Sequence, residues 1–301
     1  MKVAFVSLGC AKNLVNTEQM MALVRQAGHT VAGEAAGADV AVLNTCGFID
    51  SAKSEAIQNI LELAALKDEG KLKKLLVTGC LSQRYQKELV EELPEVDGVL
   101  GTGSYTEIVS ALEEVMAGGR PFRFGDIDHT QEDGARLVST PPYTAYLKIA
   151  EGCDNRCAYC VIPSLRGRYR SRTMESLLAE ARTLAESGVK ELIVIAQDIT
   201  RYGTDIYGKR MLGQLLQELC RLDFHWVRLH YLYPDEVDES LIDVIASERK
   251  IVKYIDIPLQ HVNDGILKAM NRRSTKAEIL ALLARLRARL PGLVLRTSLI
   301  C

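Results

Sequence analysis

Short apolar runs alternate with amphipathic segments over the first 120 residues of the chain. The runs lie at residues 3–8, 29–32, 39–44, 74–79 and 98–100. Between them, apolar residues recur at helical spacing in segments 17–27, 57–64 and 104–119. Continuous apolar strands that alternate with helices are typical of a parallel sheet covered on both faces. The pattern therefore predicts an α/β fold that begins with a doubly wound, five-stranded parallel sheet.

A second alternating pattern begins at residue 143, after an aperiodic segment rich in acidic residues, glycine and proline. Its expected strands are 143–149, 191–196, 226–231, 253–257 and 293–299, and its expected helices are 174–187, 211–222, 238–247 and 275–289. Repeated strand–helix units of this kind predict a partial (β/α) barrel. We therefore expect an N-terminal domain at 1–125, a linker at 126–142 and a barrel at 143–301.

Three of the apolar runs in the first domain end at a cysteine, namely Cys10, Cys46 and Cys80. These runs are the first, third and fourth strands, which are neighbours in the common strand order 2-1-3-4-5. The three thiols then share the carboxyl edge of the sheet, where strands lie about 4.8 Å apart and ligands bind. A glycine that permits close backbone approach stands beside each thiol, at Gly9, Gly47 and Gly79. This arrangement predicts a metal-cluster site, and three core cysteines gathered by chance are the alternative.

Composition and charge limit the cellular setting. The formal net charge is −2, so no chain-wide positive field exists to hold nucleic acid strongly. No apolar stretch approaches the roughly 20 residues of a membrane helix, and the N-terminus makes a poor signal peptide. We therefore expect a cytoplasmic protein, in which cysteines are more often metal ligands or catalytic groups than disulfides. Cys220 is expected to be a buried hydrophobic residue, and Cys301, the last residue, is assigned no role.

A second group of cysteines follows the first barrel strand. The stretch EGCDNRCAYC places Cys153, Cys157 and Cys160 at C-x3-C-x2-C spacing, at the end of the strand where barrel active sites are built. Three thiolates on one short loop can hold three irons of a cubane and leave the fourth iron open. A structural zinc site or an electron-transfer ferredoxin needs a fourth ligand, which this loop does not supply.

This motif, with Tyr159 before its last cysteine, resembles that of the radical S-adenosylmethionine (SAM) enzymes. The N-terminal domain with its three cysteines narrows the resemblance to the methylthiotransferases. The stretches SLGCAKNLVNTE, NTCGFIDSAKSE, AQDITRYGTD and PLQHVNDGILKAMNRR most resemble the RimO-type enzymes, which modify the β-carbon of an aspartate in a small-subunit ribosomal protein.

The resemblance implies two [4Fe-4S] clusters and SAM as cofactors. The cluster at Cys153, Cys157 and Cys160 would bind SAM at its open iron, and one-electron reduction of that cluster would cleave SAM. The cluster at Cys10, Cys46 and Cys80 would hold the sulfur to be transferred, and a second SAM would donate the methyl group. The cofactor would supply the reactivity, and the protein would supply orientation and a dry pocket.

Five further residues are expected to contact the cofactor or substrate, whereas no side chain is assigned a catalytic role. Gln197 and Asp198 end the second barrel strand, with a helix N-cap as the alternative role for them. Gln260 and His261 end the fourth strand, with a loop hydrogen bond as the alternative. Tyr159 is expected to pack on the adenine, with ordinary loop packing as its alternative.

The resemblance also implies partners, namely a ribosomal protein substrate and an electron donor. The chain departs from the family pattern at Asn16, where an aspartate is usual. It also departs at residue 301, where members of the family continue with the rest of the barrel and a substrate-recognition domain. We expect impaired turnover for that reason. A tRNA adenosine methylthiotransferase and a non-catalytic electron-transfer protein are the rival functions. The alternate arginines of LRGRYRSR, residues 166–172, are expected to be solvated or to meet an acidic or RNA-bearing partner.

Overall fold

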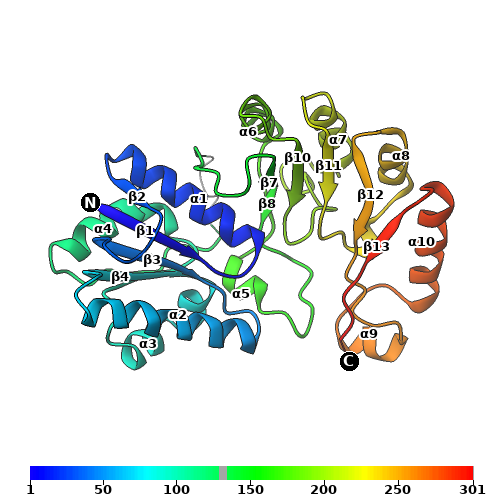
Figure 1. Cartoon of the computed structure of the whole chain (residues 1–301). Helices are drawn as coiled ribbons and strands as arrows, with labels where there is room; N and C mark the ends of the chain where they lie inside the picture. Colours follow the sequence, from blue (N-terminus) through cyan, green and yellow to red (C-terminus); the bar gives the residue numbers. More distant parts are fainter. Residues whose placement is uncertain (129–133, 301) are drawn as a thin grey trace. The chain divides into compact units, whose positions relative to one another are not determined.

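The structure is a computed structural model that describes residues 1–128 and 134–300 (Figure 1). Residues 129–133 of the predicted linker and Cys301 therefore lie outside the described part of the chain. The chain divides into two compact units, Met1–Ser139 with Val161–Gly167, and Thr140–Cys160 with Arg168–Cys301. The division differs from the expected domains at Val161–Gly167, which the sequence analysis assigned to the barrel.

The first unit contains a parallel sheet with the strand order β2-β1-β3-β4-β5-β6. Its strands are β1 (Lys2–Ser7), β2 (Thr30–Ala32), β3 (Val40–Thr45), β4 (Lys74–Gly79), β5 (Gly98–Leu100) and β6 (Phe122–Arg123). The predicted order 2-1-3-4-5 is confirmed, and the two-residue β6, which no apolar run announced, extends it at one edge. Every residue of β3 is buried, because helices cover both faces of this central strand.

Helices cover the two faces of this sheet, as Figure 1 shows for α1 and α4 on one side and α2 and α3 on the other. The helical elements are α1 (Ala11–Gln26), α2 (Asp50–Asp68), α3 (Cys80–Glu92), η1 (Tyr105–Glu107), α4 (Ile108–Met116) and α5 (Ile162–Arg166). Successive residues of β3 point to opposite faces of the sheet, so Val42 packs in the core under α1 and α4 and Leu43 packs in the core under α2. The sequence analysis missed α3 and α5.

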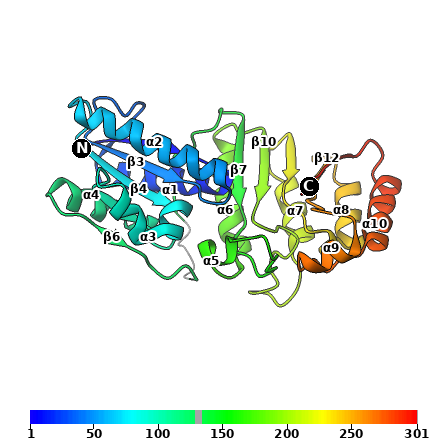
Figure 2. The same cartoon turned by 90° about the horizontal axis from the view of Figure 1, so that it is seen from below.

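The second unit contains a five-stranded parallel sheet with the order β13-β12-β11-β10-β7. Its strands are β7 (Thr144–Lys148), β10 (Glu191–Ile195), β11 (Trp226–Leu229), β12 (Ile251–Asp256) and β13 (Val294–Arg296), and a separate antiparallel pair joins β8 (Ala150–Glu151) to β9 (Arg170–Ser171). Figure 2 shows β7, β10 and β12 in this sequence across the unit. The five predicted barrel strands are therefore confirmed.

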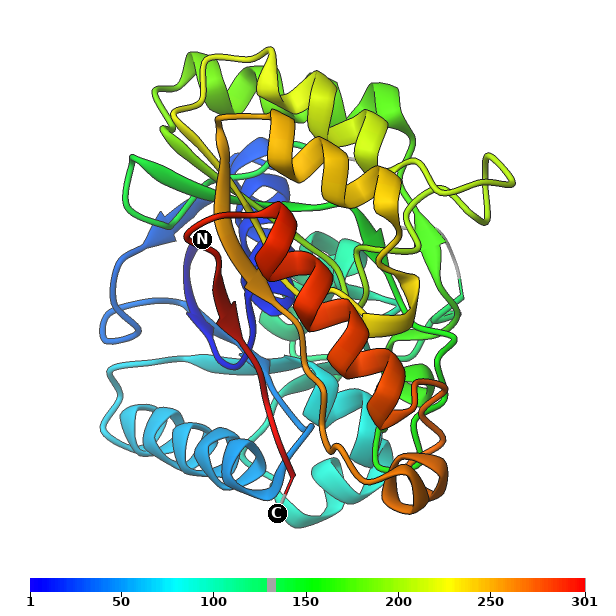
Figure 3. The same ribbon diagram turned by 90° about the vertical axis from the view of Figure 1, so that its right-hand side faces the viewer.

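Helices α6, α7, α8 and α10 line up along one side of this sheet (Figure 3). The helical elements are α6 (Met174–Glu186), α7 (Leu212–Cys220), η2 (Pro234–Glu236), α8 (Glu239–Ser247), α9 (Asp264–Ala269) and α10 (Lys276–Arg289). Thr173, Asp238, Asn263 and Thr275 cap α6, α8, α9 and α10 through their side chains, so these helices begin at residues suited to that position. Among the helical elements of this unit, the sequence analysis missed α9 and the short η2. Across the described residues, no helix combines the length and apolarity that a bilayer crossing requires.

We expect Leu76→Ala to destabilise the protein by about 2–5 kcal/mol, because Leu76 is fully buried in β4 and the substitution leaves a cavity. Leu61→Ala in α2 is the matched control, since Leu61 is 45% exposed and should change stability by less than about 0.5 kcal/mol. Urea unfolding of the two variants measures the difference. Equal effects would contradict the assignment of Leu76 to the core.

Candidate metal centres

The first group of thiols lies where three neighbouring strands of the first unit end. Cys10 follows β1 and is the N-cap of α1, Cys46 directly follows β3, and Cys80 opens α3 directly after β4. Because β1, β3 and β4 are adjacent and parallel, their carboxyl ends meet at the same edge of the sheet. The sequence analysis expected this placement from the apolar runs and the common strand order 2-1-3-4-5.

The glycine beside each thiol allows the three cysteine loops to pack directly on one another. A Cβ on Gly9 would lie 2.6 Å from the Cβ of Cys46, and one on Gly47 would lie 2.9 Å from the Cα of Leu81. Gly79 has φ +100°, and a Cβ there would lie 2.3 Å from the Oδ1 of Asn44. Each of these distances is shorter than real Cβ atoms tolerate, so the three loops converge only because these positions are glycine.

The side chain of Asn13, in the first turn of α1, joins all three cysteine loops. Its Nδ2 donates to the carbonyl of Leu8 at 3.1 Å and to that of Thr45 at 2.8 Å, so it links the Cys10 and Cys46 loops. Its Oδ1 lies 3.8 Å from the Sγ of Cys80. The Nδ2 of Asn44 in turn donates to the backbone carbonyl of Asn13 at 2.9 Å. Asn13 therefore links the three cysteine loops through its side chain.

A buried arginine lies beside the same thiols. Arg166, at the end of α5, is 5% exposed and donates to the Oδ1 of Asn16 at 2.9 Å and also to that of Asn13. The prediction that the arginine run 166–172 is solvated is therefore wrong for Arg166. Asn16 itself lies within α1.

Charge and burial act differently on two of these thiols. Burial alone would raise the pKa of Cys10, but the charges of Lys12 and Arg166 and the backbone N–H groups of Asn13 and Lys12 outweigh it and lower that pKa. Burial raises the pKa of Cys80, which is 6% exposed, and the guanidinium of Arg166 offsets part of this rise. An arginine that favours both thiolates is suited to a site that uses the deprotonated form.

The second group of thiols lies on one loop that follows β7 and β8. The N–H of Cys160 donates to the carbonyl of Cys157 at 3.0 Å, which closes a turn between them. Arg156 has φ +49°, a left-handed backbone conformation, and its carbonyl accepts from the Nδ2 of Asn271 at 2.8 Å. The N–H of Ala158 donates to the carbonyl of Met270 at 3.0 Å. Residues that follow α9 therefore fix the shape of the cysteine loop.

Two side chains beside Cys157 were missed by the sequence analysis. The hydroxyl of Tyr233 lies 3.7 Å from the Sγ of Cys157, and the Nη1 of Arg272 lies 3.9 Å from the same sulfur. The guanidinium of Arg272, which is 8% exposed, also lies 4.0 Å from the ring centroid of Tyr233. Arg272 lies in the MNRR stretch that was quoted for the family resemblance, which is the only feature of the sequence that could have pointed to it. No sequence feature pointed to Tyr233.

Gln197 and Asp198 lie at the carboxyl end of β10, as predicted. The Nε2 of Gln197 donates to Glu151 at 2.6 Å, and Lys148 donates to the same carboxylate at 2.8 Å. Asp198 accepts from the Nδ2 of Asn155 at 2.9 Å, so it supports the cysteine loop, and also from Thr200. Burial raises the pKa of Asp198, and its hydrogen bonds oppose the rise. Contact of these two residues with the cofactor stays a prediction.

The remaining predicted cofactor contacts have less distinctive surroundings. Burial and the neighbouring Cys157 raise the pKa of Tyr159, whose side chain is partly exposed. Gln260 has φ +71° and exchanges backbone hydrogen bonds with Ser298 and Ile300, and the Nδ1 of His261 accepts from the N–H of Asn263 at 2.9 Å. The last bond matches the loop role that was the alternative for His261. The cofactor roles of all three residues stay predictions.

The donor sets fit iron–sulfur clusters. Each trio supplies three thiols, and among the described residues no three His, Cys, Asp or Glu side chains are close enough to share one metal ion. A cubane makes a different demand, because each thiolate binds its own iron and the sulfurs stay apart. The Nδ2 of Asn16, whose Oδ1 accepts from Arg166, and the Oε1 of Gln197, whose Nε2 donates to Glu151, are buried without a hydrogen-bond partner among the described residues.

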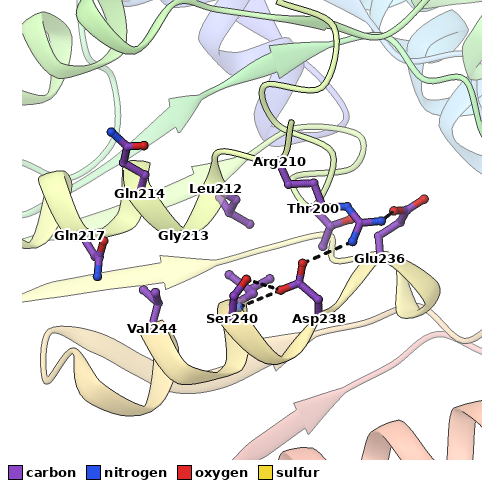
Figure 4. A pocket seen from close by; sticks show the side chains of 11 residues that line it. Thr200, Arg210, Leu212, Gly213, Gln214, Gln217, Glu236, Asp238, Ser240 and Val244 are labelled. Carbon is purple, nitrogen blue, oxygen red and sulfur yellow. Dashed lines mark hydrogen bonds and ion pairs between the residues drawn. The ribbon is translucent and has the colours of Figure 1, made fainter. Parts of the chain in front are cut away.

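A cavity of about 180 Å³ lies apart from these thiols, between α7 and α8. Figure 4 shows Arg210 at its rim, bound to Glu236 and Asp238. Asp238 also caps α8 by accepting from the N–H of Leu241 at 2.9 Å. The charged side chains of this cavity thus serve ion pairs and a helix cap, so we assign it no ligand.

Two family descriptions match the chain. Residues 147–300 match the Radical SAM superfamily, and residues 2–101 match a family described as Uncharacterized protein family UPF0004. The first match covers the cysteine loop and the sheet of the second unit. It defines the class of the protein, a radical SAM enzyme that uses SAM and a [4Fe-4S] cluster.

The curated relatives narrow this class. The chain is 50% identical over 302 residues to the ribosomal protein uS12 methylthiotransferase RimO of Lachnoclostridium phytofermentans, which covers 100% of the chain and 69% of that relative. It is 53% identical over 302 residues to RimO of Geotalea uraniireducens, which covers 99% of the chain and 67% of that relative. The chain thus spans about two thirds of their length. It belongs to the RimO family of radical SAM methylthiotransferases.

Solved structures share the fold. The methyltransferase TsrM of Kitasatospora setae, with tryptophan and a SAM analog bound, matches 98% of this chain and 67% of its own with a TM-score of 0.70 at 14% identity. The cobalamin-dependent enzyme OxsB matches 99% of this chain and 49% of its own with a TM-score of 0.65 at 14% identity. At such identities the likeness concerns the fold alone.

Alkylation of the metal-free protein should show a lower apparent pKa for Cys10 than for Cys153. The pKa of Cys10 lies below the ordinary 9.0, whereas burial raises that of Cys153 to about 11. Since the thiolate reacts, Cys10 should reach its maximal rate at a lower pH than Cys153. Iodoacetamide labelling followed by mass spectrometry from pH 6 to 10 should include the midpoint for Cys10, whereas the rate for Cys153 should still be rising at pH 10, and the shape of each profile does not depend on access. Coincident midpoints would contradict the charge environment described for Cys10.

We expect Asn13→Ala to raise the alkylation rate of Cys80 roughly 30-fold in the metal-free protein. The variant loses two hydrogen bonds worth about 1 kcal/mol each, so the loops that cover Cys80 open more often. Asn59→Ala is the control, because Asn59 is exposed in α2 and donates only to the carbonyl of Glu55 at 2.9 Å. A Cys80 rate that is equal in both variants would show that Asn13 does not hold the loops together.

Proposed function

We propose that this chain adds a methylthio group to the β-carbon of an aspartate in ribosomal protein uS12 of the small subunit. The observation that carries the proposal is the presence of two separate trios of thiols in one chain, combined with 50% identity to enzymes named for uS12. A reaction that makes a radical and also delivers sulfur needs two such sites. The relatives favour the protein substrate over the rival adenosine of tRNA.

We assign one cluster to each trio. Cys153, Cys157 and Cys160 would hold the SAM-binding cluster, which when bound supplies the one-electron cleavage of SAM. Cys10, Cys46 and Cys80 would hold the cluster that carries the sulfur. Around them, the chain's own residues orient and shield these groups: Asn13 keeps the first trio together, and Asn155, Asn271 and Asp198 hold the second loop in shape.

The predicted cofactor contacts complete this assignment. Gln197, Asp198, Gln260 and His261 follow strands at the carboxyl edge of the barrel sheet, where they would bind SAM or substrate. Tyr159 would pack on the adenine. We further propose that a protein electron donor reduces the clusters, and that the reaction takes place in the cytoplasm, where a ribosomal protein is available.

The proposal predicts different losses from the two trios. After anaerobic reconstitution with iron and sulfide, addition of SAM and dithionite should release 5′-deoxyadenosine. The triple variant Cys153→Ala, Cys157→Ala, Cys160→Ala should lose this release by at least about 100-fold, because no iron remains to bind SAM. The triple variant Cys10→Ala, Cys46→Ala, Cys80→Ala should keep the release but lose methylthio transfer to uS12, measured by mass spectrometry.

Cys220→Ala is the matched control, since this cysteine lies buried in α7 and should tolerate the change in both assays. A purely electron-transferring protein would release no 5′-deoxyadenosine with any of these variants. Modification of tRNA adenosine in place of uS12 would reject the substrate but leave the reaction class intact.

A further inference from the structure

Arg166 reaches the first trio from an unexpected part of the chain. It ends α5, a short helix that belongs to the first unit although the segments before and after it, Thr140–Cys160 and Arg168–Cys301, belong to the second. The hydroxyl of Thr102 donates to the carbonyl of Leu165 at 2.5 Å and anchors the helix there. Gly167, with φ +73°, then turns the chain away. Seven residues, Val161–Gly167, therefore belong to the first unit and place Arg166 in it.

The guanidinium of Arg166 is held by side chains that themselves lie at the trio. It donates to the Oδ1 of Asn16 at 2.9 Å and to the Oδ1 of Asn13, the oxygen that lies 3.8 Å from the Sγ of Cys80. Arg166, Asn13 and Asn16 are all nearly inaccessible to solvent, at 5%, 1% and 3% exposure. A permanent positive charge is thus fixed one amide group away from a thiol.

Such a charge has a definite effect on a cluster. Charges interact more strongly where water is excluded than at the surface. When a cluster takes up one electron, its negative charge increases, and a nearby cation stabilises that reduced form. Net charge and hydrogen bonds around the sulfurs are the main determinants of cluster potentials. The planar fork of arginine also fits two amide oxygens at once, which a lysine ammonium cannot match.

We propose that Arg166 is a positioning residue for the cluster of Cys10, Cys46 and Cys80: it raises the one-electron reduction potential of that cluster and fixes Asn13 against its ligands. This inference rests on the assignment of a cluster to the first trio made under the proposed function. It makes a residue from the segment after Cys160 part of the sulfur-carrying site.

The test isolates the first cluster in the full chain. The variant Cys153→Ala, Cys157→Ala, Cys160→Ala is reconstituted anaerobically with iron and sulfide, and dithionite supplies the electron during a potentiometric titration followed by electron paramagnetic resonance. Arg166→Gln should shift the midpoint to more negative potential, and Arg166→Lys, which keeps the charge, should shift it less. Asn16→Asp keeps an oxygen acceptor for Arg166 but adds a negative charge, so it should shift the midpoint in the same direction.

Arg168→Gln is the matched control. Arg168 lies two positions after Arg166 and is exposed, so this variant removes the same charge from the surface. Its midpoint should equal that of the parent. Iron content and urea unfolding of every variant show whether the cluster and fold survive. If Arg166→Gln loses iron, Asn16→Asp still reports on the charge, and an unshifted midpoint in that variant overturns the proposal.

Different results would overturn the assignment of a cluster to the first trio and the role of Arg166. A parent protein that binds no cluster overturns the assignment of the first trio, and this inference with it. A parent with a cluster whose midpoint ignores both Arg166→Gln and Asn16→Asp overturns the inference alone. Because the readout is the potential of the cluster, neither result depends on whether the chain modifies uS12.

Discussion

The adjacency of β1, β3 and β4 is the constraint on which the first site depends. Parallel strands present the same end to the same edge, so a cysteine after each of three neighbours must share one small region. Adjacency alone leaves the loops free to diverge, and the close contacts at Gly9, Gly47 and Gly79 remove that freedom. Asn13 then ties the loops together with hydrogen bonds, so the site is built by the sheet and finished by one amide.

The two trios solve the same chemical problem by opposite means. The first collects cysteines that lie 36 and 34 residues apart, from Cys10 to Cys46 and from Cys46 to Cys80, so it exists only after the sheet has formed. The second places three cysteines within eight residues, from Cys153 to Cys160, so its loop is local and depends on outside support for its shape. Asn271 and Met270 provide that support through hydrogen bonds to the loop backbone.

Much of this architecture was predictable from the sequence, because periodicity and strand ends are local properties. The strand order of the first sheet, the five strands of the second and the shared edge of three thiols all followed from apolar runs and topology rules. The structural surroundings of Arg166 and Arg272 did not. Their importance arises from burial against residues distant in sequence, and an arginine in a charged run looks the same whether it is solvated or buried. For Gln260 and His261 the sequence could not separate a ligand role from a loop role, since a polar residue after a strand serves either equally well.

The excursion of Val161–Gly167 into the first unit has a consequence for how this protein can be divided. No single cut in the polypeptide yields the complete first unit, because a fragment ending near Ser139 lacks α5. Exchange of whole domains between related proteins, whether by recombination or in the laboratory, would therefore separate Cys10, Cys46 and Cys80 from Arg166. The two alternating patterns of the sequence suggest two separable domains. The five-residue helix α5 prevents that separation, because it belongs to the first unit but follows part of the second in the chain.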